Sequence, residues 1–185
     1  MFKFEVKLTE EDFLEFNKIH LFYSEQTGKQ VKNLRSIFTV LPVVLWPVTT
    51  VLADFSLREL IARGLVYLPL AALFWFGVKP SMWLFTKQTL KKTLKKGDRL
   101  FSPAATLEFN DDVMVETTDI NRSESKYSLI QSVYLVNGKI FYLYINSMQA
   151  FLLPVSAFAS AEQYNNFLDF IQSKTKPLII INEKR

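Results

Sequence analysis

The chain has 185 residues, no cysteine, one histidine and a formal net charge of +4. The lack of cysteine excludes disulfide scaffolds, thiol catalysis and thiolate metal sites, and a single histidine, His20, leaves little scope for metal binding or imidazole acid–base chemistry. The charge is too small to indicate a nucleic-acid-binding protein by itself. Aromatic residues make up 15% of the chain and Phe alone supplies 17, which is typical of a membrane protein or a strongly apolar core.

The first residues predict a strand followed by a helix. "FKFEVKL" alternates apolar and charged residues, the period of a half-buried strand. Thr9 and Asp12 then stand three residues apart, as in a capping box at the start of a helix, and Gly28 is a suitable residue to end it. The apolar face that we expect for this helix consists of Phe13, Phe16, His20 and Tyr23.

Two uncharged apolar runs follow, and together they predict a transmembrane hairpin. Residues 37–53 span seventeen positions without a charge and residues 64–78 span fifteen. As helices they would measure roughly 26 and 23 Å, close to the thickness of the hydrocarbon layer, and Ile61 and Ala62 lengthen the second if Arg63 snorkels. The alternative is a pair of buried helices in a soluble domain, but such helices normally keep a polar stripe and neither run has one. The linker, residues 54–60, is too short for a domain.

Lysine and arginine predict the orientation of this hairpin. The linker offers only Arg58, with Arg63 at its edge, whereas the outer flanks are rich in basic residues. Because loops rich in lysine and arginine stay in the cytoplasm, we expect a multi-pass protein of the cytoplasmic (inner) membrane with both termini cytoplasmic. The flanking basic residues are Lys29, Lys32 and Arg35 before the first run, and Lys79, Lys87, Lys91, Lys92, Lys95 and Lys96 after the second.

The stretch "KQTLKKTLKK" predicts a basic amphipathic helix with an apolar edge formed by Trp83, Leu90 and Leu94, which Gly97 would end. A juxtamembrane cluster of this size attracts anionic headgroups by about 1 kcal/mol per lysine. The alternative, that the lysines only fix the topology, stays open. Nucleic acid is disfavoured as a partner, since no recognised binding motif accompanies the lysines. The expected headgroup-binding residues are Lys87, Lys91, Lys92, Lys95, Lys96 and Arg99, and the expected membrane-interface anchors are Trp75 and Trp83.

The C-terminal third predicts five to six short antiparallel strands closed by a helix. "ATLEF" and "VMVETT" flank a turn at residues 110–112, and Asn137-Gly138 is a strong hairpin signal before "KIFYLYI", which we expect to be a central strand. A turn at residues 146–147 precedes the strand that Pro154 ends. Ser160 and Gln163 form a capping box for a helix whose apolar face is Tyr164, Phe167, Leu168 and Ile171. The apolar tail "PLIII" adds a strand, packs on the N-terminal strand or meets a second chain.

In these features the chain resembles the YcxB-like family of small bacterial membrane proteins. The resemblance rests on "LTEEDFLEF", the two-run hairpin, "NGKIFYLYI" and "LLPVSAFASAEQYNNFLDFIQSK". It implies a pleckstrin-homology-like C-terminal domain and supplies no reaction. Family members often carry a basic residue soon after the proline, where this chain has Val155 and Ser156, so no ligand role is carried over to that position.

The expected fold is therefore an α+β membrane protein, a two-helix transmembrane hairpin plus a pleckstrin-homology-like antiparallel β domain closed by a C-terminal helix. The expected segments are an N-terminal strand and helix (1–34), the hairpin (35–80), the basic juxtamembrane helix (81–100) and the cytoplasmic β domain (101–185). Since phosphate-binding loops and nucleophile elbows are absent from the sequence, we expect a non-catalytic module without cofactor or metal. Its cytoplasmic domain would bind anionic lipid headgroups or a protein partner. The alternative is an accessory subunit of a larger membrane complex, held through the hairpin to a membrane-protein partner or a second copy of the chain.

Overall fold

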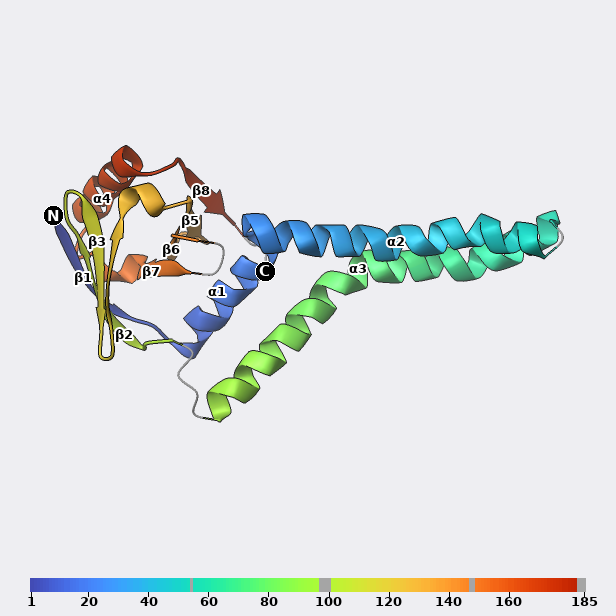
Figure 1. Cartoon of the computed structure of the whole chain (residues 1–185), viewed down its shortest axis with the longest axis horizontal. Coiled ribbons are helices and arrows are strands. Elements are labelled where there is room, and N and C mark those ends of the chain that lie inside the picture. The colour runs from blue at the N-terminus through green and yellow to red at the C-terminus, as the bar shows by residue number, and fades with distance from the viewer. Residues whose placement is uncertain (54, 97–100, 147–148, 183–185) are drawn as a thin grey trace. The chain divides into compact units, whose positions relative to one another are not determined.

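The computed structural model describes residues 1–53, 55–96, 101–146 and 149–182 (Figure 1). The chain forms two compact units, of which one combines Met1–Phe16 with Arg99–Arg185 and the other comprises Asn17–Asp98. The first unit holds the strands and the second holds two long helices. The segments predicted from the sequence instead group the N-terminal strand with the helix that follows it (1–34) and assign the C-terminal strands to a separate segment (101–185).

The first sheet of the strand-bearing unit contains β1 (Phe2–Lys7), β2 (Ala104–Phe109), β3 (Val113–Thr118) and β4 (Arg122–Lys126), in that order and antiparallel throughout. Strand β1 pairs along its whole length with β2, from Phe2 opposite Phe109 to Lys7 opposite Ala104. The alternation predicted for β1 is confirmed, since Phe4 and Val6 are each 2% exposed. The helical segment is thus inserted between two neighbouring strands of one sheet.

The second sheet contains β5 (Ser132–Val136), β6 (Ile140–Tyr144), β7 (Ala150–Pro154) and β8 (Leu178–Ile181), in the order β7-β6-β5-β8. Only β8 is parallel to its neighbour β5. The predicted hairpin turn is confirmed, because Asn137 and Gly138 both have positive φ, 51° and 65°, as a type I′ turn requires. Strand β6 is central and buried on both faces, as predicted. The apolar tail adds the strand β8, which is the first of the three outcomes left open for it. Ser147, in the turn predicted at residues 146–147, lies outside the described residues.

Helix α4 (Ala161–Lys174) closes the core between the two sheets (Figure 1). The Oγ of Ser160 accepts a hydrogen bond from the backbone N–H of Gln163 at 3.1 Å, which confirms the cap. Phe167 is fully buried and its ring lies 4.9 Å from that of Phe109 in the first sheet and 5.8 Å from that of Phe141 in the second. Edge-to-face contacts of this kind add about 0.5–1.5 kcal/mol each to area burial. The α+β class with an antiparallel β domain and a C-terminal helix is confirmed.

Helix α1 (Glu10–Tyr23) begins with the predicted capping box. The Asp12 carboxylate accepts from the Thr9 N–H at 2.9 Å, and the Asp12 N–H donates to Thr9 Oγ1 at 3.1 Å. The predicted end is wrong, because α1 stops before Ser24 and Gly28 lies inside the next helix. There a Cβ would lie 2.7 Å from the backbone oxygen of Phe22, so the glycine permits a close approach between turns. The predicted apolar face is confirmed in part, since Phe13 and Phe16 pack against the rings of Phe101 and Tyr142. The buried residues of α1 are instead Leu14 and Ile19, and Tyr23 is 43% exposed.

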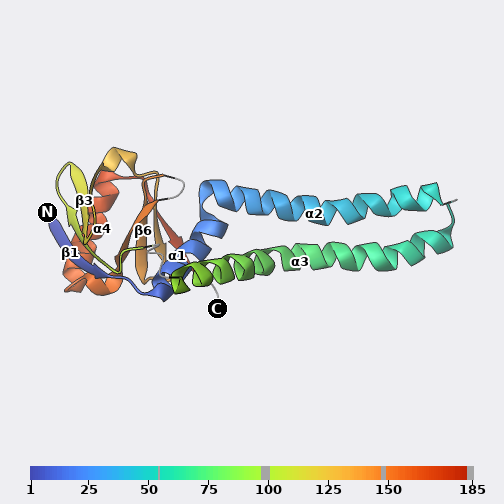
Figure 2. The ribbon, with the colours of Figure 1, turned by 60° about the horizontal axis from the view of Figure 1, so that its bottom comes forward.

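The second unit is built on α2 (Glu25–Leu52) and α3 (Leu57–Lys95), which pack side by side in opposite directions (Figures 1 and 2). Helix α2 contains the first predicted apolar run up to Leu52 and begins well before it, and α3 contains the second run and extends beyond it at both ends. Pro42 and Pro47 lie inside α2, and Pro69 and Pro80 lie inside α3. Figure 1 shows α3 turning away from α2 in its C-terminal part, and a proline without an N–H, such as Pro80, is the usual cause of such a bend.

Candidate membrane-associated surface

The two long helices expose apolar side chains on nearly every turn. Phe76 is 75% exposed, Leu65 73% and Val51 65%. In each helix, only 11% of the most apolar 18-residue stretch is buried within the protein, whereas a core helix of a soluble protein would be mostly buried. By length and composition, Thr27–Leu52 and Leu57–Lys95 are candidate membrane spans, which indicates association with a membrane.

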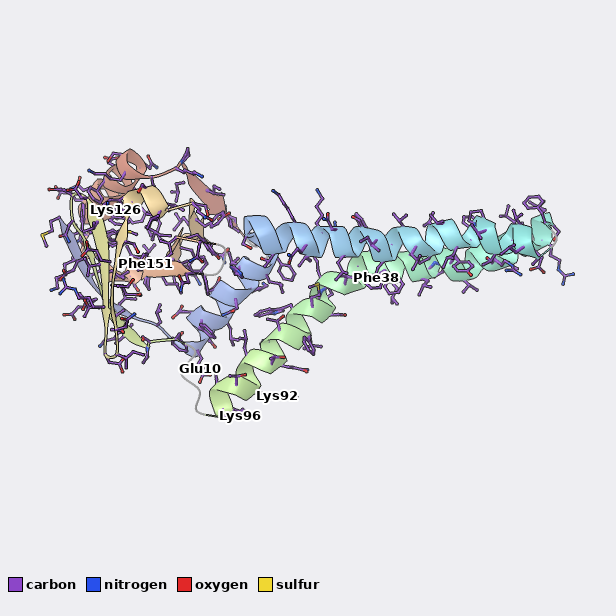
Figure 3. The ribbon with its side chains drawn as sticks, in the orientation of Figure 1. Glu10, Phe38, Lys92, Lys96, Lys126 and Phe151 are labelled. Atoms are coloured by element: carbon purple, nitrogen blue, oxygen red, sulfur yellow. The ribbon has the colours of Figure 1, made fainter. Side chains whose placement is uncertain are left out.

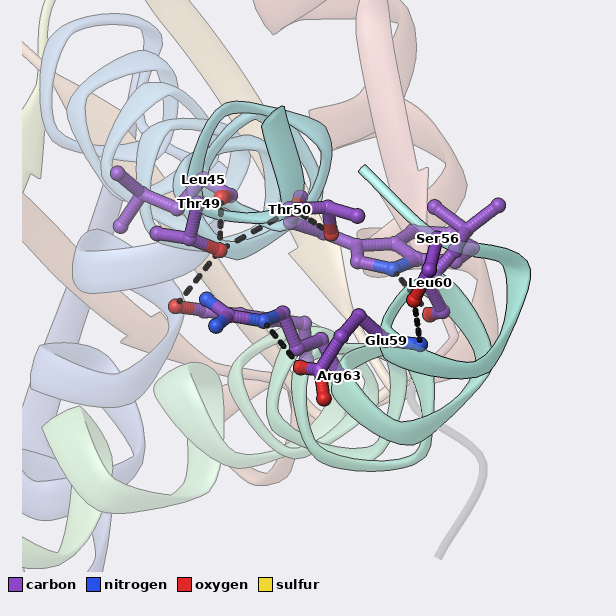
Figure 4. A network of polar contacts seen from close by, with 9 residues as sticks. Leu45, Thr49, Thr50, Ser56, Glu59, Leu60 and Arg63 are labelled. Atoms are coloured by element: carbon purple, nitrogen blue, oxygen red, sulfur yellow. Dashed lines mark hydrogen bonds and ion pairs between the residues drawn. The ribbon is translucent and has the colours of Figure 1, made fainter. Parts of the chain in front are cut away.

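A group of polar contacts ties α2 to α3 at the end of the hairpin next to the linker (Figure 4). The Trp46 indole donates to the backbone oxygen of Leu60 at 2.9 Å, and Thr49 Oγ1 lies 3.5 Å from the Tyr67 hydroxyl. Ser56 caps α3 by accepting from the Glu59 N–H at 3.2 Å. In an apolar medium such bonds satisfy groups that no water reaches. No role was predicted for Trp46 because it stands in the middle of its apolar run.

The other end of the hairpin carries an aromatic–cation pair. The Arg35 guanidinium of α2 lies 4.0 Å from the ring centroid of Trp75 on α3, and Lys79 lies 5.6 Å from the ring centroid of Phe22. The Nε of Arg35 is buried and has no hydrogen-bond partner among the described residues. Trp75 is 42% exposed, so a predicted anchor does stand at the surface. Arg35 was counted for orientation only, although equal distances from the linker would have suggested this pairing.

The lysines lie on the last turns of α3 (Figure 3 labels Lys92 and Lys96). The apolar edge predicted for this stretch, Trp83, Leu90 and Leu94, is half-buried. Within the part of the chain that the structure describes, none of the predicted lysines forms an ion pair with an acidic side chain. Among the described residues, the cluster is therefore a basic surface without an acidic partner. Lys87 is half-buried, and the exposed members are Lys91, Lys92, Lys95 and Lys96.

Two residues of the expected helix end, Gly97 and Arg99, lie outside the described residues. The helix itself runs without interruption from the second apolar run through Lys95, with Lys96 as its C-cap. Lys92 and Lys95 stand in its last turn, where positive charge complements the helix dipole. The basic stretch thus belongs to the same helix as the second apolar run, and its lysines follow a candidate membrane span along α3.

The fold and this surface define the class: an α+β protein with two candidate membrane-spanning helices. Comparison adds that residues 109–171 match the model of the YcxB-like protein family. The expected resemblance is confirmed over that segment, which runs from the end of β2 to the last buried residue of α4. No curated protein and no solved structure matches the chain.

Proposed function

We propose that the chain is a non-catalytic, membrane-anchored module. Helices α2 and α3 span the cytoplasmic (inner) membrane as a hairpin, and both termini lie in the cytoplasm. The last turns of α3 bind anionic lipid headgroups and hold the strand-bearing unit near the bilayer. The observation that carries this proposal is a mostly exposed lysine cluster, without an acidic partner among the described residues, on a helix that continues directly from an apolar span.

The positions of Arg35 and Trp75 support a common interfacial level. At 1.5 Å per residue, the distance from Arg35 to Leu52 is roughly 26 Å and the distance from Leu57 to Trp75 is roughly 27 Å. Both values are close to the roughly 30 Å of the hydrocarbon layer. Arg35 and Trp75 would therefore stand at the cytoplasmic boundary, where an indole ring is favourable and a lipid phosphate can accept from the guanidinium.

The strand-bearing unit supports a pleckstrin-homology-like assignment, because two sheets that are antiparallel apart from the β5–β8 pair, closed by a C-terminal helix, match its main elements. Strand β1 would then be the first strand of the domain, with the hairpin inserted between β1 and β2. On this assignment the hairpin joins the domain at both ends, through α1 and through the lysine-bearing end of α3. The domain would present its free surface to a headgroup or a protein partner.

The test uses the full chain in nanodiscs, with hydrogen exchange as the readout. All five lysines from Lys87 to Lys96 are changed to Gln, and exchange over residues 84–96 is compared in phosphatidylglycerol and phosphatidylcholine discs. We expect stronger protection in the anionic discs, which the variant loses. If the parent chain and the five-lysine variant are equally protected in both kinds of disc, the headgroup role is contradicted. A matched control changes five exposed lysines of the other unit, Lys7, Lys126, Lys139, Lys174 and Lys176.

A second candidate function, an accessory subunit of a larger membrane complex, is favoured by one feature of α3. A Cβ added at Gly77 would meet nothing within 4 Å, and Ala72 is exposed, so small residues leave room for another helix. A stoichiometric partner that survives detergent purification and is lost in Gly77→Leu would support this function. A lone monomer would count against it.

A further inference from the structure

The strand-bearing unit contains a cavity of about 320 Å³ that the proposed membrane role does not use. Its aromatic wall combines rings of α1 with rings from the second half of the chain. Phe13 of α1 stacks on Phe101 with ring centroids 4.8 Å apart, and Phe16 lies edge-on to Tyr142 at 5.4 Å. Phe151 of β7, labelled in Figure 3, contributes a further ring. The volume lies at the lower end of the range for small-molecule sites.

One carboxylate stands on the core side of this cavity. Glu116 of β3 is directly opposite Leu107 of β2 and Ser123 of β4. Directly opposed residues in an antiparallel sheet share a face, and Leu107 is 3% exposed. Glu116 therefore occupies the core-facing side of its sheet, where an apolar residue would ordinarily stand.

Nothing in the described lining compensates the charge of Glu116. The other polar lining residues are neutral, and no lysine, arginine or histidine contributes to the wall. Within the described residues Glu116 forms no ion pair. Burial raises the pKa of its carboxyl group, which is the expected effect of desolvation without a positive partner. The neutral polar lining residues are Ser102, Thr118, Asn121, Ser123 and Gln149.

We propose that this cavity binds a small organic cation, an ammonium group carried on a short apolar body. The ammonium group would pair with the Glu116 carboxylate and donate to neighbouring hydroxyl or amide oxygens. The apolar body would lie against the phenylalanine rings, which favour both hydrophobic contact and a nearby positive charge. An anionic ligand would face the lone carboxylate, and a neutral ligand would leave it unpaired, so the wall selects a cation.

The experiment titrates the full chain with three probes of similar size and different charge. The protein is held in phosphatidylcholine nanodiscs, and empty discs provide the blank for membrane partition. The probes are 2-phenylethylammonium, 2-phenylethanol and 3-phenylpropanoate, and calorimetry gives the Kd of each. We expect saturable binding of 2-phenylethylammonium with the lowest Kd of the three.

Variants then connect the binding to this cavity. Glu116→Gln keeps the side-chain shape and should raise the Kd of the ammonium probe about tenfold or more, because it removes a charge-assisted hydrogen bond. Glu124→Gln is the matched control, since Glu124 is exposed on the neighbouring strand. Ala105→Leu, which fills part of the cavity, should weaken binding of the ammonium probe without removing the carboxylate.

The proposal is overturned by any of three results. The first is that the ammonium probe does not bind saturably, and the second is that the anionic probe has a Kd equal to or below that of the ammonium probe. The third is that Glu116→Gln and Glu124→Gln lose affinity for the ammonium probe to the same extent. Amide exchange of β2 and β3 in each variant shows that the sheet is intact. If Glu116→Gln disturbs the sheet, the Ala105→Leu result decides, and unchanged ammonium binding in that variant overturns the proposal.

Discussion

The indole N–H of Trp46 on α2 donates to the backbone oxygen of Leu60 on α3 at 2.9 Å, and Gly64 lies one turn further along α3 beneath the same ring. A Cβ at Gly64 would come within 2.8 Å of the Trp46 ring. The ring cannot yield without losing the hydrogen bond to Leu60. The glycine and the tryptophan therefore form one packing unit that fixes the distance between the two helices.

We expect Gly64→Ala to destabilise the helical unit by about 1–3 kcal/mol, the usual cost of overpacking. Gly77→Ala is the matched control, because its Cβ meets nothing within 4 Å and alanine is a better helix former by about 1 kcal/mol. Thermal unfolding in detergent, followed by tryptophan fluorescence, measures both. All three tryptophans of the chain lie in α2 and α3, so this signal reports on that unit. Equal shifts in the two variants would contradict the prediction.

Removing the guanidinium from the face of Trp75 gives a second prediction. Arg35→Gln should lower the stability of the helical unit by about 0.5–1 kcal/mol, the size of a cation–π contact at a partly exposed site. It should also change the fluorescence of Trp75 in a variant whose other two tryptophans are phenylalanine. Lys32→Gln removes the same charge from an exposed position of α2 and should leave the Trp75 signal as it is. A common response to both changes would point to net charge instead of the contact.

Local signals in the sequence predicted much of the fold. The Thr9–Asp12 and Ser160–Gln163 caps, the Asn137-Gly138 turn and the two apolar runs each depend on residues close together in the chain, and the structure contains them all. Gly28 misled the prediction of a helix end because glycine also serves close packing between turns. The position of one glycine in the sequence does not distinguish a helix end from close packing between turns.

Long-range relationships could not be predicted in the same way. Strand β1 was recognised, but its pairing with β2 joins residues about a hundred positions apart, and no periodicity encodes a partner. Glu116 was read only as part of a strand, since the face that a strand buries depends on the sheets it meets. The lysine cluster was found because charge patterning is local, whereas the cavity needs the assembled sheets.

The pKa of Glu116 gives a prediction about pH. Burial raises this pKa above its ordinary value of 4.5, so the folded state binds the proton more tightly than the unfolded state. Stability therefore falls as the pH rises from 4.5 through the folded-state pKa, and the cost is fully present above that window. Glu116→Gln should be more stable than the parent protein at pH 7.5, and the difference should shrink towards pH 4. Hydrogen exchange of β3 across this range is the measurement. A difference that grows on acidification would show the opposite linkage.

The place of β1 in the core gives the last prediction. Phe4 is 2% exposed and its ring lies 4.7 Å from that of Phe158 and 5.5 Å from that of Phe167. Phe4→Ala should therefore destabilise the strand-bearing unit by about 3–5 kcal/mol, as for a large residue removed from a packed core. The readout is amide exchange in β2, β6 and α4 of the full chain. Ile120→Ala, at a residue that is 70% exposed, should change stability by no more than about 0.5 kcal/mol. If Phe4→Ala alters exchange no more than Ile120→Ala does, β1 is not an integral strand of this unit.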